Sequence, residues 1–126
     1  NNLGTLYDQL GKYPEAIKQF NRAIELMPGE PGSYNNLAWL QATCADATYR
    51  DAPKAINMAR KACQLTGWND FSTLDTLATA YAANQDWTAA IKWQAKAIEY
   101  APQRQRADLK RRLDAYQKQK TTAGDL

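Results

Sequence analysis

The side chains that most often carry catalysis at neutral pH are scarce in this sequence. None of its 126 residues is histidine, so the commonest general base and metal ligand is missing. No glycine-rich loop ending in Lys and Ser or Thr is present to cradle a phosphate. The two serines, Ser33 and Ser72, each stand near an expected helix start, where hydroxyls ordinarily cap the backbone. The sequence therefore predicts a protein that is not an enzyme and has no catalytic residues.

Carboxylates and thiols are the remaining candidates for chemistry. Asp70 and Asp75 are close enough in sequence to pair, but acidic side chains at an exposed helix start ordinarily stabilise the helix dipole. Cys44 falls at the end of one expected helix and Cys63 about ten residues into its antiparallel partner, too far apart for a disulfide. We expect two free, mostly buried thiols. Two cysteines cannot complete a zinc site, so we expect neither a metal nor a cofactor.

The elements that must position any site follow from an internal repeat. Asn-Asn-Leu opens the chain at 1–3 and returns at 35–37, an offset of 34 residues. Residues 3–28 align without a gap on 77–102, and the segment between them fits the same pattern with five extra residues near 44–51. The positions that carry the pattern in the first and third copies are Leu3, Gly4, Tyr7, Ala16, Phe20, Ala23 and Pro28, then Leu74, Leu77, Ala78, Tyr81, Ala90, Ala97 and Pro102.

These residues and their period resemble the tetratricopeptide repeat, a helix-turn-helix unit of about 34 residues. The resemblance implies an all-α, right-handed α-solenoid of three helix pairs plus a C-terminal capping helix. The middle copy departs most, with Ala59 in place of Phe20 and Gly67 in place of Pro28, and is also similar to Sel-like repeats. The expected divisions are a truncated first repeat at 1–30, a lengthened second at 31–69, a third at 70–102, a capping helix at 103–120 and a disordered tail at 121–126.

Periodicity favours the same elements without the family. Leu74, Leu77, Ala78 and Tyr81 recur at i, i+3, i+4 and i+7, which is one stripe of a helix. We expect helices at about 1–10, 14–27, 33–45, 52–65, 70–83, 87–100 and 103–119. Small residues should stand where paired helices approach most closely: Gly4, Ala38 and Ala78 on the first helices, and Ala16, Ala55 and Ala90 on the second.

Residues at the expected helix ends fit these boundaries. Pro14 and Pro53 fall in the first turn of a helix, where proline loses no hydrogen bond. Gly11 and Asn84 tolerate the left-handed backbone that ends the preceding helix.

Positive charge is concentrated near the end of the chain. Residues 103–120 carry seven basic and two acidic side chains, a net +5 in a chain whose overall charge is +3. Leu109, Leu113 and Tyr116 form an apolar stripe there, so we expect that helix to cover the last pair while its charges face solvent. A charge this local makes nucleic acid an unlikely partner. We also expect a soluble fragment of a longer protein, without membrane insertion, and a reducing compartment such as the cytoplasm is favoured.

Stacked pairs of this kind leave a concave face lined by their first helices. In the family that this chain resembles, that face binds an extended peptide or a helix of a partner protein. The side chains expected to project there are Asn1, Asn2, Thr5, Asp8, Asn35, Asn36, Trp39, Thr43, Asp75, Thr76 and Thr79. We therefore expect a protein-interaction scaffold whose partner is another protein or a peptide segment.

Asn2, Asn36 and Trp39 are the sharpest candidates. Asn2 and Asn36 occupy equivalent positions and resemble the asparagine ladder of O-linked N-acetylglucosamine transferases, with Thr76 in place of a third asparagine. An amide offers an acceptor and two donors and so matches a peptide backbone. Both asparagines can equally be helix-surface amides near a start. Trp39 can be a binding anchor or can fill space between adjacent pairs.

A related specificity is excluded by residue types. Members of the family that grip a C-terminal carboxylate use two lysines and an arginine on successive first helices. The corresponding positions here are Asn1, Ser72 and Thr76, so a carboxylate would lose its charge-assisted partners.

Two alternatives to a free-standing scaffold stay open. The chain can be the C-terminal, substrate-recruiting region of a larger enzyme. It can also associate with itself through the apolar side left uncovered at the N-terminal repeat.

Overall fold

The chain is a series of antiparallel helices stacked side by side. The computed structural model describes residues 12–124, and within that range there are helices and no strand. The helices are α2 (Tyr13–Leu26), α3 (Pro31–Thr43), α4 (Ala52–Thr66), α5 (Phe71–Ala83), α6 (Trp87–Tyr100) and α7 (Gln103–Gly124), with a short 3-10 turn, η1 (Ala47–Tyr49), between α3 and α4. The predicted all-α solenoid is confirmed.

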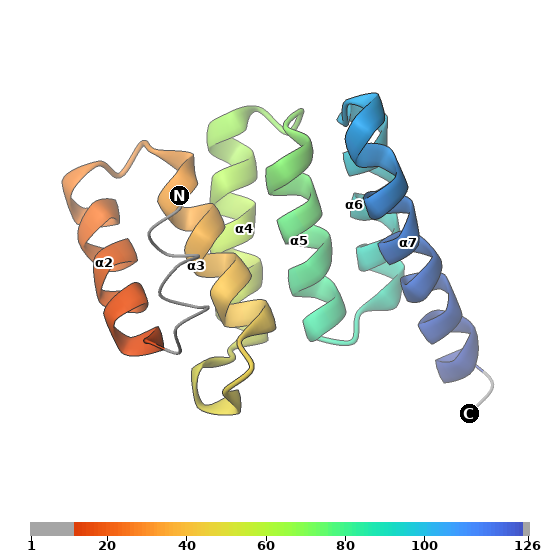
Figure 1. Cartoon of the computed structure of the whole chain (residues 1–126), viewed down its shortest axis with the longest axis horizontal. Coiled ribbons are helices and arrows are strands. Elements are labelled where there is room, and N and C mark those ends of the chain that lie inside the picture. The colour runs from red at the N-terminus through yellow and green to blue at the C-terminus, as the bar shows by residue number, and fades with distance from the viewer. Residues whose placement is uncertain (1–11, 125–126) are drawn as a thin grey trace.

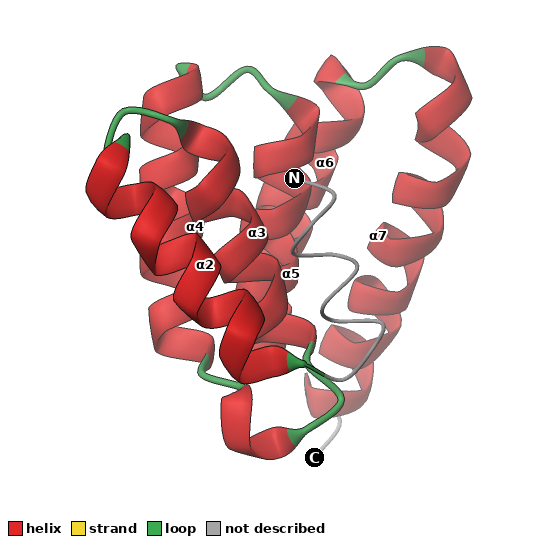
Figure 2. Cartoon of the chain, turned by 60° about the vertical axis from the view of Figure 1, so that its left-hand side comes forward, coloured by secondary structure: helices red, strands yellow, loops and turns green. Residues whose placement is uncertain are grey.

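The arrangement brings α3, α5 and α7 to one side of the stack. In Figure 1, α3 lies in front of α4 and α7 lies in front of α6, with α5 between them. A view from the side shows α5 and α6 separating α2, α3 and α4 from α7 (Figure 2). The helix expected at 1–10 lies outside the described residues. The other expected helix boundaries lie within two residues of the observed ones, except for the end of α7.

Aspartates and a glutamate, rather than serines, cap the helix starts. The Glu30 side chain accepts from the backbone N–H of Gly32 at α3, and Asp70 accepts from Thr73 N–H at α5. Asp51 and Asp86 do the same at α4 and α6. The expected capping role of Ser33 and Ser72 is therefore wrong. Helix α3 begins two residues before Ser33, and α5 begins one residue before Ser72, so a carboxylate stands at each N-cap position.

Left-handed backbone ends two of the helices. Gly67 has φ of 76° and Trp68 of 64° after α4, which suits the αL cap that glycine favours. After α5 the left-handed residue is Gln85, with φ of 60°, and Asn84 has φ of −89°. The expectation for Asn84 is wrong by one position, because α5 ends with one further turn residue. The expectation for Gly11 lies outside the described residues.

Alanines mark the places where the helices approach most closely. Ala38, Ala55, Ala78 and Ala90 are fully buried, as is Ala16 in α2. Leu74 and Leu77 from α5 are also fully buried beside them. This confirms the expected small residues of the described pairs, where a larger side chain would force the helices apart.

The inserted residues form a short, ordered connection. Asp46 caps η1 through the N–H of Thr48, and the N–H of Asp51 donates to the carbonyl of Gln41 at 2.8 Å. Cys44, at the start of this connection, is buried and free, and so is Cys63 in α4. The expectation of two buried free thiols is confirmed.

Helix α7 packs on α6 through both apolar and polar contacts. Leu109 and Tyr116 are buried, and the fully buried Gln94 of α6 donates from Nε2 to the carbonyl of Leu109 at 3.0 Å. The helix continues to Gly124, so residues 121–124 are helical and the expected disordered tail from 121 is wrong for them. The Thr121 and Thr122 hydroxyls bond carbonyls one turn earlier, which is compatible with continued helix. None of the described helices has the length and apolar character needed to cross a membrane.

Candidate functional site

A polar pocket of about 230 Å³ lies between α3 and α5. Each helix contributes three side chains, spaced so that they share one face. Those from α3 are Asn35, Asn36 and Trp39, and those from α5 are Ser72, Asp75 and Thr76. Five of the expected groove residues thus come together, and Ser72 joins them because it stands one turn before Thr76.

The side chains of the pocket are held by few hydrogen bonds. Asn35 Nδ2 donates to Ser72 Oγ at 3.5 Å and so links the two helices. The Thr76 hydroxyl is buried and donates to the carbonyl of Ser72 at 3.0 Å, inside its own helix. Three buried atoms of the pocket side chains have no hydrogen-bond partner within residues 12–124: Asn35 Oδ1, Asn36 Nδ2 and Asp75 Oδ1. Buried polar atoms are ordinarily paired, so this pocket has unused hydrogen-bonding capacity.

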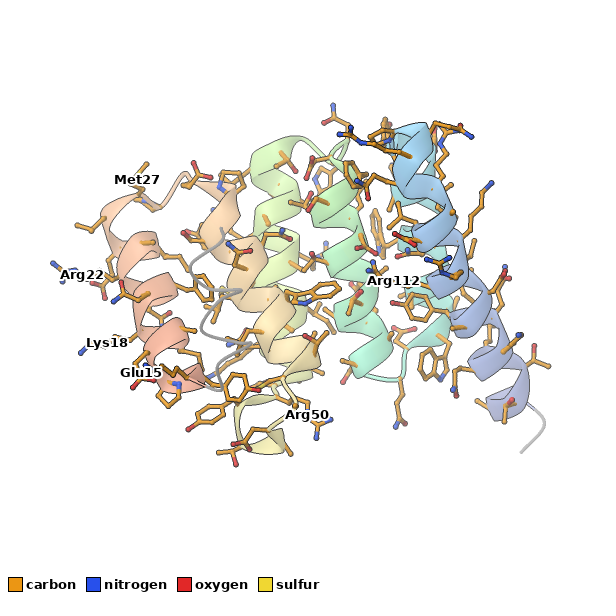
Figure 3. The ribbon with its side chains drawn as sticks, in the orientation of Figure 1. Glu15, Lys18, Arg22, Met27, Arg50 and Arg112 are labelled. Atoms are coloured by element: carbon orange, nitrogen blue, oxygen red, sulfur yellow. The ribbon has the colours of Figure 1, made fainter. Side chains whose placement is uncertain are left out.

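Arg112 of α7 reaches across to this pocket. Its Nη1 forms an ion pair with Asp75 Oδ2, and its guanidinium carbon lies 5.4 Å from the centre of the Trp39 ring. Figure 3 shows Arg112 on the side of α7 that is turned toward α5. One side chain of the last helix therefore contacts residues of both helices that form the pocket.

Two expectations about these charges are wrong. The basic side chains of 103–120 do not all face solvent, because Arg112 falls three residues after Leu109 and four before Tyr116, on the buried stripe. Its neighbour Arg111 does point outward, is 74% exposed and pairs with Asp108. Asp75 is not at an exposed helix start either, since its side chain is only 14% exposed.

Comparison with protein families agrees with the repeat in the sequence. Two models described as tetratricopeptide repeat match the chain, one over residues 1–30 and the other over residues 71–101. The chain belongs to the tetratricopeptide-repeat family. These matches fall on the first and third copies, on either side of the copy that carries the inserted residues. No curated protein matches the chain.

Membership in the tetratricopeptide-repeat family indicates a general role for the chain. Tetratricopeptide repeats generally mediate interactions between proteins and are typically non-catalytic. Repeats that stack in series form extended concave surfaces, and these are the surfaces they use for binding. The pocket lies between α3 and α5, and α5 is the first helix of the matched segment 71–101.

The remaining groove candidates are placed differently. Thr43 and Thr79 do not line the pocket; their hydroxyls donate within their helices to Trp39 O at 2.7 Å and Asp75 O at 2.9 Å. Thr79 Oγ1 also lies 3.3 Å from the Tyr116 hydroxyl, which ties α5 to α7. Burial, as the largest cause, raises the pKa of the Tyr116 phenol above its usual value. Asn1, Asn2, Thr5 and Asp8 lie outside the described residues.

The other tryptophans of this tetratricopeptide-repeat chain serve packing. Trp87 lies 6.2 Å from Tyr116, ring centre to ring centre, in the cluster between α6 and α7. Trp93 stacks on Trp68 at 5.3 Å and carries the ammonium of Lys92 4.8 Å above its ring. Of the four, Trp39 is the one that lines the pocket between α3 and α5.

A second pocket, of about 340 Å³, lies at the C-terminal ends of α3 and α5. Its lining includes Ala47 and Arg50 from the inserted residues, together with Gln41, Ala42, Ala52 and Ala83. In the described part of the chain, no group of three acidic or cysteine side chains stands close enough together to hold a metal ion.

Proposed function

We propose that this chain is a protein-interaction scaffold that binds an extended segment of a partner protein across the face formed by α3 and α5. The observation that carries the proposal is the polar pocket beside Trp39, in which buried atoms of Asn35, Asn36 and Asp75 lack hydrogen-bond partners within residues 12–124. A ligand that formed those hydrogen bonds would remove the free-energy penalty of the unpaired buried atoms.

The chemistry of the pocket suits a peptide backbone. An extended peptide presents alternating N–H donors and C=O acceptors, and the unpartnered atoms comprise two acceptors, Asn35 Oδ1 and Asp75 Oδ1, and one donor, Asn36 Nδ2. Trp39 adds a large, rigid surface of the kind that dominates binding energies at protein interfaces. Asn2 stays a candidate for the equivalent position in the first repeat.

Selection of peptides from a random display library on the purified chain tests the proposal. A selected peptide should bind Trp39→Ala at least about tenfold more weakly than wild type, because buried indoles are typical interface anchors. Asn36→Ala should weaken binding severalfold, while Asn57→Ala, an exposed asparagine of α4, should leave it unchanged. Each variant is first checked for an unchanged helical circular-dichroism spectrum and unfolding temperature. Equal affinity of wild type and Trp39→Ala for every selected peptide would exclude this groove as the site.

The pocket between α3 and α5 also has a role if the chain is part of a larger enzyme. In that setting it would recruit a substrate protein, and the selected peptides would resemble a segment of that substrate. Activity of the intact parent toward the substrate should then fall with Trp39→Ala while its activity toward a short substrate lacking that segment stays the same.

Self-association is a second candidate, favoured by apolar side chains at the end of α2. Leu26 is 68% exposed and the adjacent Met27 is 60% exposed, and Figure 3 shows Met27 projecting outward from this end. Exposed apolar side chains at the end of a repeat stack tend to pair with another surface. Sedimentation at several concentrations should show a dimer that Leu26→Ser with Met27→Ser dissociates. A monomer at all concentrations would remove this candidate.

Nucleic acid is disfavoured as a partner. Among the basic side chains of 103–120, Arg112 is paired with Asp75 of α5, a carboxylate that lies outside this segment and is not counted in its net charge of +5. This leaves less positive charge free on that helix than its composition suggests.

A further inference from the structure

The pocket between α3 and α5 already holds a basic side chain, that of Arg112. We propose that the partner segment carries an arginine or lysine whose cationic group takes the place of Arg112 against Asp75 and Trp39. This inference rests on the function proposed above and adds the chemical class of the side chain that the groove selects.

The unpaired atoms of the pocket call for hydrogen-bond donors. Asp75 Oδ1 and Asn35 Oδ1 are buried acceptors without a partner in the described residues, against a single donor group, Asn36 Nδ2. Guanidinium and ammonium groups are donors only, and they bind carboxylates more strongly than neutral groups do. A basic side chain therefore satisfies more of this pocket than a neutral or an acidic one.

Arg112 satisfies the pocket only in part. Its Nη1 contacts Asp75 Oδ2, while Asp75 Oδ1 keeps no partner in residues 12–124. An arginine can engage both oxygens of a carboxylate with two parallel bonds. A guanidinium that approaches along the groove, rather than from α7, has access to that arrangement once Arg112 moves away.

Arg112 is free to leave, whereas Asp75 is not. The Arg112 side chain is 40% exposed, so its charge can return to water at small cost. The Asp75 side chain is 14% exposed and stays in the pocket when Arg112 departs. An uncompensated buried carboxylate is strongly unfavourable, which makes exchange for another cation the favoured outcome.

The Trp39 ring is the second half of the subsite. Arg112 shows that a guanidinium can lie over this ring while it contacts Asp75. Attraction between a cation and the face of an indole is stronger than for other aromatic rings. A lysine or arginine of the partner would use the same face, and a citrulline, equal in shape but uncharged, would gain much less from both contacts.

The test titrates the folded chain with N-acetyl-arginine N-methylamide and with its citrulline counterpart, and follows the indole N–H signal of Trp39 by NMR. Comparison with Trp39→Phe assigns that signal. The arginine probe should shift it with an affinity at least about tenfold higher than the citrulline probe, since hydrogen bonds to a charged group exceed those to a neutral one. Equal shifts from the two probes would overturn the inference.

Two variants separate a competitor from a binding residue. Arg112→Ala should bind the arginine probe severalfold more tightly, because the competing guanidinium is gone, whereas Arg111→Ala should bind as wild type does. Asp75→Asn should lose the preference for arginine over citrulline. Weaker binding by Arg112→Ala, or retained preference in Asp75→Asn, contradicts the exchange.

Peptides selected on the whole chain distinguish this inference from the function on which it rests. Selected peptides should share an arginine or lysine at one position, and its replacement by citrulline or norleucine should cost about tenfold in affinity. Peptides that depend on Trp39 but share an acidic residue, or no charged residue, would contradict the proposed preference for a basic side chain. They would still support the proposed peptide-binding function. If no selected peptide depends on Trp39, both are wrong.

Discussion

The guanidinium carbon of Arg112 lies 5.4 Å from the centre of the Trp39 ring, so α7 contacts α3. Arg112 also forms an ion pair with Asp75 of α5. Three helices that are far apart in sequence are thus connected through one cation. A solenoid is usually held by contacts between neighbouring repeats, and this longer connection lies at the face where binding is proposed.

Removal of the Arg112 side chain should destabilise the fold measurably. Arg112→Ala leaves the mostly buried Asp75 without its ion-pair partner, which should lower the free energy of unfolding by about 1 to 2 kcal/mol. Arg111→Ala removes an exposed pair on the same helix and should change it by less than about 0.5 kcal/mol. Urea unfolding of the two variants measures the difference, and equal stabilities would show that the Arg112 contacts contribute nothing to folding.

The buried side chain of Gln94 should stabilise the contact between α6 and α7 mainly through packing. Gln94→Ala removes a fully buried side chain and its bond to the Leu109 carbonyl, which should cost about 3 kcal/mol. Gln94→Met fills nearly the same volume and also removes the unpaired acceptor Oε1, so it should cost about 1 kcal/mol or less. Thermal or urea unfolding measures both. A loss as large for methionine as for alanine would mean that the hydrogen bond, not the packing, dominates.

The end of α4 should depend on glycine for its backbone conformation alone. A Cβ added at Gly67 meets no atom within 4 Å, but its φ of 76° is unfavourable for any other residue type except asparagine and aspartate. Gly67→Ala should therefore cost about 1 kcal/mol, and Gly67→Asn less. Gly29 has equal space and no positive φ, so Gly29→Ala should be neutral or slightly stabilising. Equal effects of alanine at the two positions would contradict the conformational explanation.

Cys63 should make the fold sensitive to alkaline pH. Burial, as the largest cause, raises the pKa of its thiol to about 11, and the unfolded chain should release that proton near pH 8.5. The stability that the protonated thiol provides is thus complete below about pH 8.5 and is lost as the pH rises through about 11, a change on the order of 3 kcal/mol. Urea unfolding of wild type and Cys63→Ala from pH 8 to 11 measures it. The variant should lose less stability over that range, and parallel curves would contradict the assignment to Cys63.

The stacking of the helices was predictable because it depends on local and repeated features. Alanine at 38 and 78 stands at equivalent positions of successive copies, and the need for a small residue there follows from the closeness of paired helices. The prolines at 14 and 53 mark helix starts by the chemistry of their own backbone, and both fall in a first turn.

The candidate site was predictable only on its own helices. Asn35, Asn36 and Trp39 share a face of α3, and Asp75 and Thr76 share one of α5, because helical spacing decides both. The role of Arg112 depends on how α7 lies against α5, which no local spacing reveals. Its place on the stripe of Leu109 and Tyr116 was the one available signal, and an arginine on such a stripe is easily taken for a charge at its edge.

Small differences at helix ends show a second limit. Ser72 stands two residues after the N-cap position, and only the backbone conformation decides that Asp70 caps α5. Likewise Gln85 rather than Asn84 adopts the left-handed conformation, although asparagine tolerates it better. The first case lies at the start of α5 and the second at its end, and in both the intrinsic preference of one residue type did not locate the position.

The most direct test of the central claim is a map of where a selected peptide touches the chain. Titration of the isotope-labelled protein with that peptide should shift the NMR signals of Asn35, Asn36, Trp39 and Asp75 most strongly, and should leave those of Lys18 and Arg22, on the outward face of α2 in Figure 3, in place. Shifts confined to α2, α4 and α6, with the signals of Asn36 and Trp39 unchanged, would contradict binding at the pocket between α3 and α5.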